Sequence, residues 1–307
     1  MGKLLAICIS EKRGTQKFQI PEAELKENWG IVGDAHAGNW HRQVSLLDIQ
    51  QIEEFRSKGA NVEFGAFGEN LITEGFDWRS VQVGSRILIG ECELELSQIG
   101  KACHDHCAIY KAVGDCIMPR EGVFAKVIRG GSIKPGDEMK VEPIAKDHPY
   151  TAAVITLSDR AYNQEYEDRS GPEIVRILAE KGYDVVEALL LPDGIPMLKS
   201  NLIRLADQRQ VNVIFTTGGT GFAPRDLTPE ATVAVCDRMA DAITQAILYK
   251  SLEITDRAML SRQRAGIRGK TLIVNLPGSP KACREDLGII LPALEHGLGI
   301  LRGTAAD

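Results

Sequence analysis

From residue 150 to the C-terminus, strand-like and helix-like segments alternate, and this order restricts the fold more than any other feature. Residues 151–157 are almost continuously apolar, as strands buried on both faces of a parallel sheet are. A helix is predicted from Ser170, its N-cap, with Glu173 at N3 and Gly182 just past its end. The order of elements specifies an α/β three-layer sandwich with a mainly parallel sheet. The remaining predicted strands are 184–191, 211–215 and 270–275, and the remaining helices are about 195–209, from Thr228, and from Pro280.

The first half of the chain has short apolar runs separated by glycines. Its last run, 92–99, alternates apolar and polar residues, as a half-buried strand does. These runs favour a mostly-β, barrel-like domain. Further strands are predicted at 81–83, 86–90 and 138–141, a helix at 45–55, and a turn at 134–137.

The regular pattern stops between Pro143 and Pro149, and 307 residues are enough for about two domains. We therefore predict a barrel domain over residues 1–143, a linker over 144–150 and an α/β domain over 151–307.

Charge and cysteine content exclude several function classes. The net charge is −6, with 18 Lys and Arg against 22 Asp and Glu in residues 1–150 and 18 against 20 in the rest. Neither half has a basic surface by composition, so we expect no nucleic-acid or membrane partner. The apolar run at the N-terminus is too short for a signal peptide or a membrane span, which favours a cytoplasmic location.

The chain has seven cysteines, an odd number. In a reducing compartment this indicates free thiols, a metal or catalysis rather than disulfides. Cys236 and Cys283 fall in predicted helices and are expected to be inert.

A glycine-rich loop, Thr216–Gly221, follows the predicted strand 211–215. Glycines allow close backbone approach to an anion, and the helix that follows supplies free N–H groups at its start. The loop is not a P-loop, because no Gly-Lys-Ser/Thr follows it, and by itself it is equally compatible with an ordinary strand-to-helix turn. Asp226 follows the glycines, before an N-cap Thr228 and Pro229. A carboxylate beside a phosphate-binding loop implies a bridging metal ion.

Four predicted strand ends carry polar or glycine-rich segments. In open α/β sheets, ligands bind beyond the carboxyl ends of the strands, so these segments should share one edge. Each one alone is also explained as a turn. They are Ser158–Arg160, Pro192–Asp193, the glycine loop with Asp226, and Leu276–Pro280.

Together with Ala258–Arg262, these segments resemble the molybdopterin adenylyltransferases of the molybdenum cofactor pathway, in order, over about residues 151–303. The resemblance implies transfer of AMP from ATP to the terminal phosphate of molybdopterin, with release of pyrophosphate and with Mg²⁺, in a commonly trimeric protein. By position, Asp193 and Asp226 match the catalytic and metal-associated aspartates of that family.

The same resemblance implies a substrate pocket around these aspartates. Asp159 has an equally good explanation as a loop-capping residue. Where many family members have Pro-Gly-x-x-Glu, this chain has Asp241–Gln245, so one polar or metal contact near the pterin is in doubt at Gln245. The implied substrate-binding residues are Ser158, Asp159, Thr217, Gly218, Gly219, Thr220, Gly221, Ser261, Arg262, Pro277, Gly278 and Ser279.

The densest group of soft metal ligands lies at Cys103–Cys107, with Cys116 nearby. Three interpretations remain open. The cysteines and a histidine could hold zinc, although the spacing is irregular. Cys107 and Cys116 could be buried structural thiols. Cys103 could be a reactive thiolate whose pKa Lys101 and His104 lower.

The first half also resembles the MOSC domain, over about residues 1–143, at Gly33–Gly38, His41–Ser45 and Phe67–Leu71. That family is a β-barrel associated with sulfuration of the molybdenum cofactor. Cys103 matches its characteristic cysteine, although Ala102 stands where the family usually has proline. The resemblance implies that the cofactor pocket contains His36, Arg42, Glu69 and Asn70; otherwise these are surface turn residues.

We therefore interpret the chain as a fusion of a MOSC domain with a molybdopterin adenylyltransferase domain, with ATP and molybdopterin as substrates and cofactor-accepting enzymes as partners. The rival hypothesis is a carrier or scaffold that binds the pterin or the cofactor without turnover. A third possibility is a structural zinc site that makes the first domain purely structural.

Overall fold

The computed structural model describes residues 1–57, 59, 62–101 and 117–305. The chain divides into two compact units, Met1–His148 and Pro149–Asp307. The division falls within the range predicted as a linker. None of the helices in the described ranges has the length and apolar character needed to cross a bilayer.

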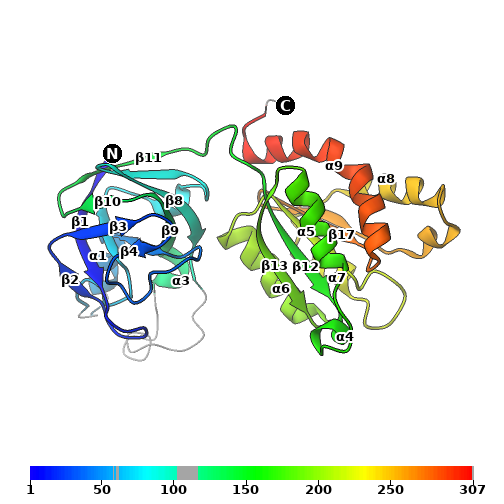
Figure 1. Cartoon of the computed structure of the whole chain (residues 1–307), viewed down its shortest axis with the longest axis horizontal. Helices are drawn as coiled ribbons and strands as arrows, with labels where there is room; N and C mark the ends of the chain where they lie inside the picture. Colours follow the sequence, from blue (N-terminus) through cyan, green and yellow to red (C-terminus); the bar gives the residue numbers. More distant parts are fainter. Residues whose placement is uncertain (58, 60–61, 102–116, 306–307) are drawn as a thin grey trace. The chain divides into compact units, whose positions relative to one another are not determined.

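The first unit is a β-barrel of seven strands, which confirms the predicted fold class of this half (Figure 1). The ring runs in the order β11-β7-β8-β9-β5-β6-β1 and closes where the start of β1 pairs with β11. Neighbouring strands are antiparallel except β5 and β6, which are parallel. The strands are β1 (Gly2–Ile9), β5 (Val44–Asp48), β6 (Leu71–Glu74), β7 (Arg86–Ile89), β8 (Cys92–Ile99), β9 (Val123–Arg129) and β11 (Glu138–Glu142).

Shorter elements complete this unit. Strand β2 (Phe18–Ile20) pairs with the far end of β1, and a separate small sheet has the order β10-β3-β4. The other elements are β3 (Ala23–Lys26), β4 (Gly30–Ile31), β10 (Gly131–Ile133), α1 (Ile49–Ser57), α3 (Met118–Glu121) and the 3₁₀ turn η1 (Trp78–Ser80).

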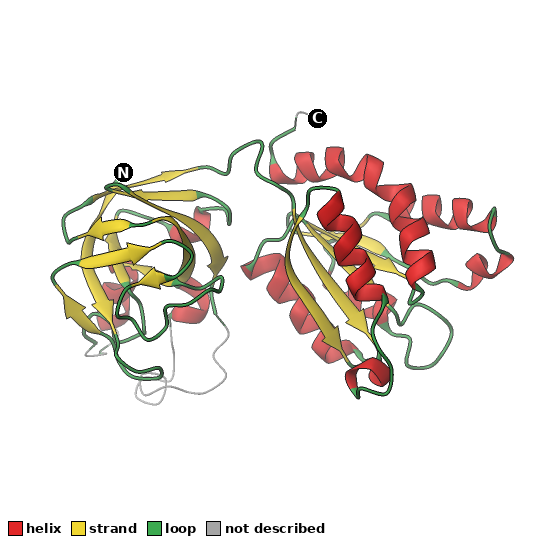
Figure 2. Cartoon of the chain, in the orientation of Figure 1, coloured by secondary structure: helices red, strands yellow, loops and turns green. Residues whose placement is uncertain are grey.

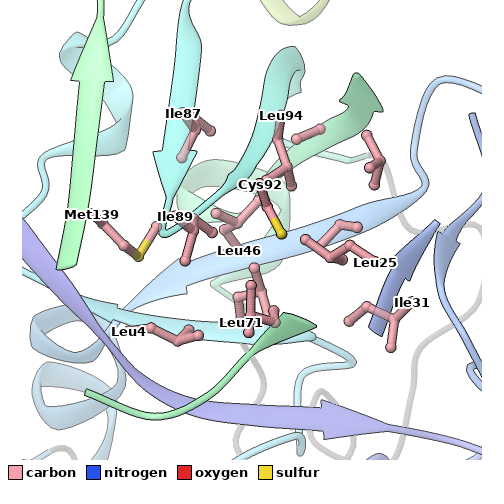
Figure 3. Close-up of a cluster of buried hydrophobic side chains, with 14 of the residues drawn as sticks. Leu4, Leu25, Ile31, Leu46, Leu71, Ile87, Ile89, Cys92, Leu94 and Met139 are labelled. Atoms are coloured by element: carbon pink, nitrogen blue, oxygen red, sulfur yellow. The ribbon is translucent and has the colours of Figure 1, made fainter. Parts of the chain in front are cut away.

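The barrel interior is filled with aliphatic side chains that come from opposite sides of the ring. Figure 3 shows Leu4, Ile89 and Met139 lying together there, near Leu46 and Leu71. The alternation predicted for 92–99 has this cause, since successive side chains of a strand point to opposite faces. The barrel is therefore a packed core, which leaves its loops for binding.

Two local predictions in this unit are wrong. The helix predicted at 45–55 begins only at Ile49, because Val44–Asp48 is the fully buried strand β5, paired with both β6 and β9. Asp48 marks the change, and its carboxylate accepts a hydrogen bond from Gln50 N at 3.1 Å at the start of α1. The segment 81–83 forms no strand, because the 3₁₀ turn η1 and the turn before β7 occupy this part of the chain.

The second unit is an α/β sandwich, as predicted, around a six-stranded sheet of order β13-β12-β14-β17-β16-β15 (Figure 2). The first four strands in this order are parallel, and β16 and β15 continue the sheet antiparallel. Neither of these two antiparallel strands was predicted. The strands are β12 (Thr151–Leu157), β13 (Asp184–Leu191), β14 (Val213–Thr217), β15 (Arg238–Met239), β16 (Ala265–Arg268) and β17 (Thr271–Leu276).

Helices cover both faces of this sheet, which gives the three predicted layers. One core includes Ile174 of α5, Ile247 of α8 and Leu291 of α9, and the other includes Leu198 of α6 and Val235 of α7. The helices are α4 (Asp159–Tyr162), α5 (Ser170–Glu180), α6 (Ile195–Ile203), α7 (Thr228–Val235), α8 (Asp241–Leu252) and α9 (Pro280–Arg302), with the π-helical turn η2 (Arg204–Gln208) and the 3₁₀ helix η3 (Asp256–Leu260).

Both predicted N-caps are wrong in the same way. Ser170 is the first residue of α5, and the carboxylate of Asp168 accepts the N–H groups of Ser170 and Gly171 at 3.0 and 3.1 Å. The other Asp168 oxygen accepts from Thr156 Oγ1 at 2.7 Å, which ties the start of the helix to β12. Thr228 is likewise inside its helix, and its hydroxyl donates to the carbonyl of Gly218 at 2.9 Å.

Candidate functional site

The carboxyl ends of β13, β12, β14 and β17 lie side by side at one edge of the sheet (Figure 1). Backbone hydrogen bonds connect their loops: Ser158 N donates to Leu191 O at 3.0 Å, and Gly218 N donates to Leu276 O at 3.3 Å. The structure therefore brings the four predicted segments together at one edge.

The glycine loop has a backbone that other residues cannot adopt without strain. Gly218 and Gly219 have φ values of +94° and +64°. A Cβ at Gly218 would lie 2.3 Å from Leu157 O, and one at Gly219 would lie 2.4 Å from Thr228 Oγ1. The loop of β17 is also close, because a Cβ at Gly278 would lie 3.6 Å from Gly218 Cα. Close packing therefore requires glycine at these positions.

The threonine hydroxyls near this loop are used to fix it in place. Thr217 is fully buried, and its Oγ1 donates to Pro277 O at 2.7 Å, which joins the loop of β14 to that of β17. Thr216 Oγ1 accepts from Asn275 Nδ2 at 2.9 Å. Thr220 is buried as well. The predicted role of Thr217 and Thr220 in holding phosphate remains a prediction.

Arg262 fixes the far end of the same loop. Its Nε donates to Gly221 O at 2.7 Å, and its backbone N donates to Thr220 O at 2.9 Å. The guanidinium also bonds the carboxylate of Glu230 and the carbonyl of Asp226. The planar group thus holds the glycine loop and the Asp226 segment together. The neighbouring Ser261 hydroxyl donates to Gln263 Oε1 at 2.8 Å.

Three aspartates converge beside the glycine loop. Asp159 Oδ1 accepts from Asp193 N at 2.9 Å, and Asp193 Oδ2 accepts from Asp159 N at 3.3 Å, so each carboxylate holds the backbone of the other loop. Asp226 Oδ2 accepts from Ala223 N at 2.9 Å. Burial raises the pKa of Asp193; the N–H of Asp159 and the cation of Arg225 oppose this, and the charges of Asp159 and Asp226 reinforce it. The site therefore concentrates negative charge.

No group of three or more His, Cys, Asp or Glu side chains in the described ranges is arranged to hold a metal ion. Mg²⁺, however, is commonly bound by one or two carboxylates together with substrate phosphates and water. The donors at Asp193 and Asp226 are oxygens. Burial raises the pKa of Asp193, and the negative charges of Asp159 and Asp226, which a cation would neutralise, add to the shift. The residues present fit such an ion when it arrives with a phosphate substrate.

Two cavities lie next to Ser261. The larger, about 690 Å³, is bordered by α7 and α8 and includes Gln245, the position where the family pattern departs. The smaller, about 200 Å³, lies among α8, η3 and α9 and is lined by Ile247, Leu248, Ser251, Ile254, Thr255, Arg257, Ala258, Ser261, Gln263, Pro277, Ala282, Glu285 and Asp286.

Of the remaining predicted residues, Gly278 and Ser279 are exposed at the start of α9, and Ser158 caps α4 through its Oγ, 3.2 Å from Ala161 N.

In the barrel unit, a buried ion pair lies beside His36, one of the residues predicted to line the cofactor pocket. Lys17 Nζ lies 2.6 Å from Asp34 Oδ1, and both side chains are at most 2 % exposed. Burial opposes ionisation of Asp34, but hydrogen bonds from His36, Lys17 and Ser10 outweigh it and hold the pKa of Asp34 below its usual value. The His36 ring is one-third exposed, with Nδ1 3.4 Å from Ser10 Oγ and 3.5 Å from Lys17 Nζ. His36 therefore borders solvent beside a buried cation.

Arg42, Glu69 and Asn70 have contacts within the protein. The guanidinium of Arg42 lies over the Trp40 ring at 4.8 Å. Glu69 is buried and accepts from the N–H groups of its own loop, and burial raises its pKa to about 7 against those bonds. Asn70 Nδ2 donates to Cys8 O at 2.9 Å. These contacts stabilise the loops, and a role in lining a cofactor pocket stays a prediction. Cys103, Cys107 and Cys116 lie outside the described residues.

The sequence interpretation missed four residues that shape these sites. Lys17 lies in a polar stretch with no periodicity, so no pattern marked it. Asp168 was overlooked because Ser170 matched the N-cap preference. Gln263 and Asp286, which contact each other across 2.9 Å, come from a loop and a helix 23 positions apart, and no local pattern connects them.

Comparison with known proteins assigns a family to each unit. Residues 33–140 match the family described as MOSC domain, and residues 153–296 match the family described as probable molybdopterin binding domain. A molybdopterin adenylyltransferase of Helicobacter pylori is 41 % identical over 153 residues, 49 % of this chain and 87 % of that protein. Gephyrin of Dictyostelium discoideum is 42 % identical over 166 residues, 51 % of this chain but only 23 % of that protein.

One solved structure, a molybdopterin biosynthesis enzyme of Thermus thermophilus, is 42 % identical and covers 50 % of this chain and 97 % of its own, with a TM-score of 0.48. The two family matches define a protein in which a MOSC domain precedes a molybdopterin-binding domain. Through its second domain, the chain belongs to the molybdopterin adenylyltransferase family.

Proposed function

We propose that this chain acts in molybdenum cofactor biosynthesis and that its second domain transfers the adenylyl group of ATP to the terminal phosphate of molybdopterin. The observation that carries the proposal is the convergence of Asp159, Asp193 and Asp226 on the glycine loop at one sheet edge. The names of the Helicobacter pylori, Haemophilus influenzae and Escherichia coli relatives, all molybdopterin adenylyltransferases, support the same reaction.

In this reaction, an oxygen of the pterin phosphate attacks the α-phosphorus of ATP, and the bond to pyrophosphate breaks. Such a transfer depends on positioning and charge neutralisation more than on a covalent partner. A bound Mg²⁺ would neutralise phosphate charge, and we propose that Asp193 and Asp226 hold it. The glycine loop lets the backbone approach a phosphate, while Thr217 and Arg262 keep the loop rigid.

We propose that the barrel domain handles the finished cofactor or its sulfur, as its resemblance to the MOSC family implies. We propose Cys103 as the sulfur-handling residue. The Lys17–Asp34 pair supports binding of an anionic group near His36, because a buried ammonium lies 3.5 Å from the partly exposed ring. Joining two domains that handle the same pterin raises the effective concentration of one site for the other.

Two further features remain proposals. We propose a homotrimer in the cytoplasm, with transfer of the cofactor to acceptor enzymes. Self-association is supported by apolar side chains exposed on α8 and η3, including Tyr249, Met259 and Leu260.

The direct test is to incubate the purified chain with ATP, Mg²⁺ and molybdopterin and to measure adenylylated pterin and pyrophosphate. We expect Asp193→Asn and Asp226→Asn to lower the rate about 100-fold or more, because each removes a carboxylate that we propose holds the Mg²⁺. Asp184→Asn is the matched control, since Asp184 is exposed at the start of β13, and Asp193 lies in the loop that follows the other end of this strand. Near-normal transfer by both variants would exclude the mechanism. Molybdopterin binding without any product in the wild-type chain would favour the carrier hypothesis.

A further inference from the structure

Arg225 lies at the corner of a tight turn between the glycine loop and α7. Ala223 N donates to Asp226 Oδ2 at 2.9 Å, and Asp226 N donates to Ala223 O at 2.9 Å, so two hydrogen bonds close the turn. Pro224 occupies the second position of the turn, where proline is favoured because its φ is already set. The guanidinium of Arg262 also bonds the carbonyl of Asp226. The backbone of Arg225 is therefore held in place.

The side chain of Arg225, in contrast, reaches into solvent next to a half-enclosed carboxylate. It is 67 % exposed, and its Nε lies 4.0 Å from Oδ2 of Asp193, whose side chain is only 12 % exposed. This distance is the outer limit for an ion pair, and exposed pairs stabilise a protein little. Arg262, the other arginine near the glycine loop, differs because three groups of the protein already bond its guanidinium. Arg225 has a weak contact that it can exchange for another.

The charges at this edge of the sheet give the Arg225 cation two kinds of partner. Burial raises the pKa of Asp193, and the charges of Asp159 and Asp226 add to the shift, while the charge of Arg225 opposes it. Arg225 thus offsets part of the negative charge of the carboxylates. A nucleotide that arrives with Mg²⁺ changes this balance, because the ion neutralises the carboxylates and the nucleotide supplies phosphate oxygens. A planar guanidinium, which can bond two phosphate oxygens at once, then favours the phosphates.

We propose that Arg225 exchanges partners during the reaction: it pairs with Asp193 before the nucleotide binds, and it binds the β- and γ-phosphates of ATP afterwards. The inference rests on the proposed function, because ATP is a substrate of that reaction. As the pterin phosphate oxygen bonds to the α-phosphorus, the bond from this phosphorus to the bridging oxygen breaks, and its electron pair passes to the pyrophosphate. Arg225 stabilises the charge that develops there, so it is a catalytic residue that acts on the leaving group.

The first measurement tests the pairing with Asp193 in the full chain without nucleotide. Mn²⁺, which replaces Mg²⁺ as a probe, is titrated and the free ion is followed by its electron spin resonance signal. We expect Arg225→Gln to bind Mn²⁺ about three- to tenfold more tightly than the wild-type chain, because a competing cation is removed from the carboxylates. Arg176→Gln is the matched control and should bind Mn²⁺ as the wild type does, since Arg176 is an exposed arginine that pairs with Glu173 and Glu180 of its own helix α5. Unchanged or weaker Mn²⁺ binding by Arg225→Gln would overturn the proposal.

The second measurement tests the contact with the phosphates. Calorimetric titrations with Mg²⁺ present compare α,β-methylene-ATP, which cannot be cleaved at the reacting bond, with AMP, which lacks the β- and γ-phosphates. We expect Arg225→Gln to bind the triphosphate analogue about 10- to 100-fold more weakly and to bind AMP as the wild type does, because only the former loses a charge-assisted bond. The affinity for molybdopterin should stay unchanged, and the kcat of adenylyl transfer should fall about tenfold or more.

Equal effects of Arg225→Gln on the triphosphate analogue and on AMP would overturn the proposal. Weaker molybdopterin binding with unchanged nucleotide binding would overturn it as well, since the guanidinium would then bind the pterin phosphate. Adenylyl transfer at the wild-type rate by Arg225→Gln would refute the role of Arg225 and leave the proposed function intact. If the wild-type chain shows the preference for the triphosphate that depends on Arg225 but makes no adenylylated product, the proposed function fails while the assignment of Arg225 as a phosphate ligand stands.

Discussion

Replacing Gly218 by alanine tests whether the glycine loop is fixed by close packing. Gly182, just after α5, has a similar backbone, with φ of +82° against +94° for Gly218. The surroundings differ, because a Cβ at Gly182 meets nothing within 4 Å, whereas one at Gly218 would lie 2.3 Å from Leu157 O. The two alanine variants therefore share the backbone strain and differ in the steric contact.

The size of each effect follows from these contacts. Alanine at positive φ costs about 1–2 kcal/mol, and the stiffer unfolded chain returns about 0.4–1 kcal/mol. We therefore expect Gly182→Ala to lower the free energy of unfolding by about 0.5–1 kcal/mol. At Gly218, the added methyl group must move about 0.7 Å, from 2.3 Å to the 3.0 Å below which such contacts are essentially never seen. Relieving an overlap of this kind costs a further 1–3 kcal/mol, roughly, in a packed core.

The assay can follow the two domains separately. All three tryptophans, Trp29, Trp40 and Trp78, lie in the barrel unit, so their fluorescence reports its unfolding only. Calorimetry then shows the transition of the second unit. For a domain of this size, each kcal/mol lowers Tm by about 2–4 °C. We expect Gly218→Ala to lower the Tm of the second transition by about 3–16 °C and Gly182→Ala by about 1–4 °C, with the tryptophan transition unchanged in both.

Adenylyl transfer should also decrease in Gly218→Ala, since the loop backbone must shift away from Leu157. Equal stability of the two alanine variants, within about 0.5 kcal/mol, would refute the steric argument. It would mean that the loop relaxes freely and that the glycines serve ligand approach alone.

Three other predictions concern the remaining parts of the chain. Asp34→Asn leaves Lys17 as an uncompensated buried cation and should destabilise the barrel by about 3–5 kcal/mol, measured by urea unfolding followed through tryptophan fluorescence. Because the folded-state pKa of Asp34 lies below its ordinary 3.8, this stabilisation is present above that pH and is lost as the pH falls below it, so the variant should show a smaller loss of stability on acidification. Arg262→Lys removes the bond from Nε to Gly221 and should lower kcat about tenfold with little change in the KM for ATP, whereas a large KM change alone would indicate direct substrate contact. Residues 149–307 expressed alone should fold and retain adenylyl transfer, and an insoluble fragment beside an active full chain would contradict the independence of this unit.

The fold class followed from the sequence because its strongest patterns are local. The apolar run at 151–157 is the buried strand β12, which pairs with β13 and β14, and the alternation at 92–99 is the barrel strand β8. The errors arose where tertiary contacts override local preference. Residues 45–48 form a strand because β6 and β9 pair with it on both sides, which no helical periodicity can show. The antiparallel strands β15 and β16 are too short, at two and four residues, to give a periodic signal.

The location of the candidate site was predictable, but the use of its side chains was not. Strand ends of a parallel sheet share an edge, so the grouping of Asp159, Asp193 and the glycine loop follows from topology. Which hydroxyl faces a ligand depends on packing between distant segments. Thr217 donates to Pro277, which is 60 residues away, and Arg262 bonds to Gly221, which is 41 residues away. Sequence patterns within one loop carry no information on such contacts.

The architecture of the aspartate site follows a single physical requirement. Asp159 and Asp193 repel each other, and the N–H groups that they accept from one another offset part of that repulsion. The repulsion that remains destabilises the folded state, and a cation bound together with phosphate would relieve it. Such a cation and phosphate would therefore bind more strongly at this edge than at a neutral loop. Such a site needs carboxylates that cannot move apart. Thr217, Arg262 and the crowded glycines restrain the neighbouring loops. We therefore infer that the polar side chains around the proposed phosphate site contribute mainly rigidity, and that the aspartates contribute the charge.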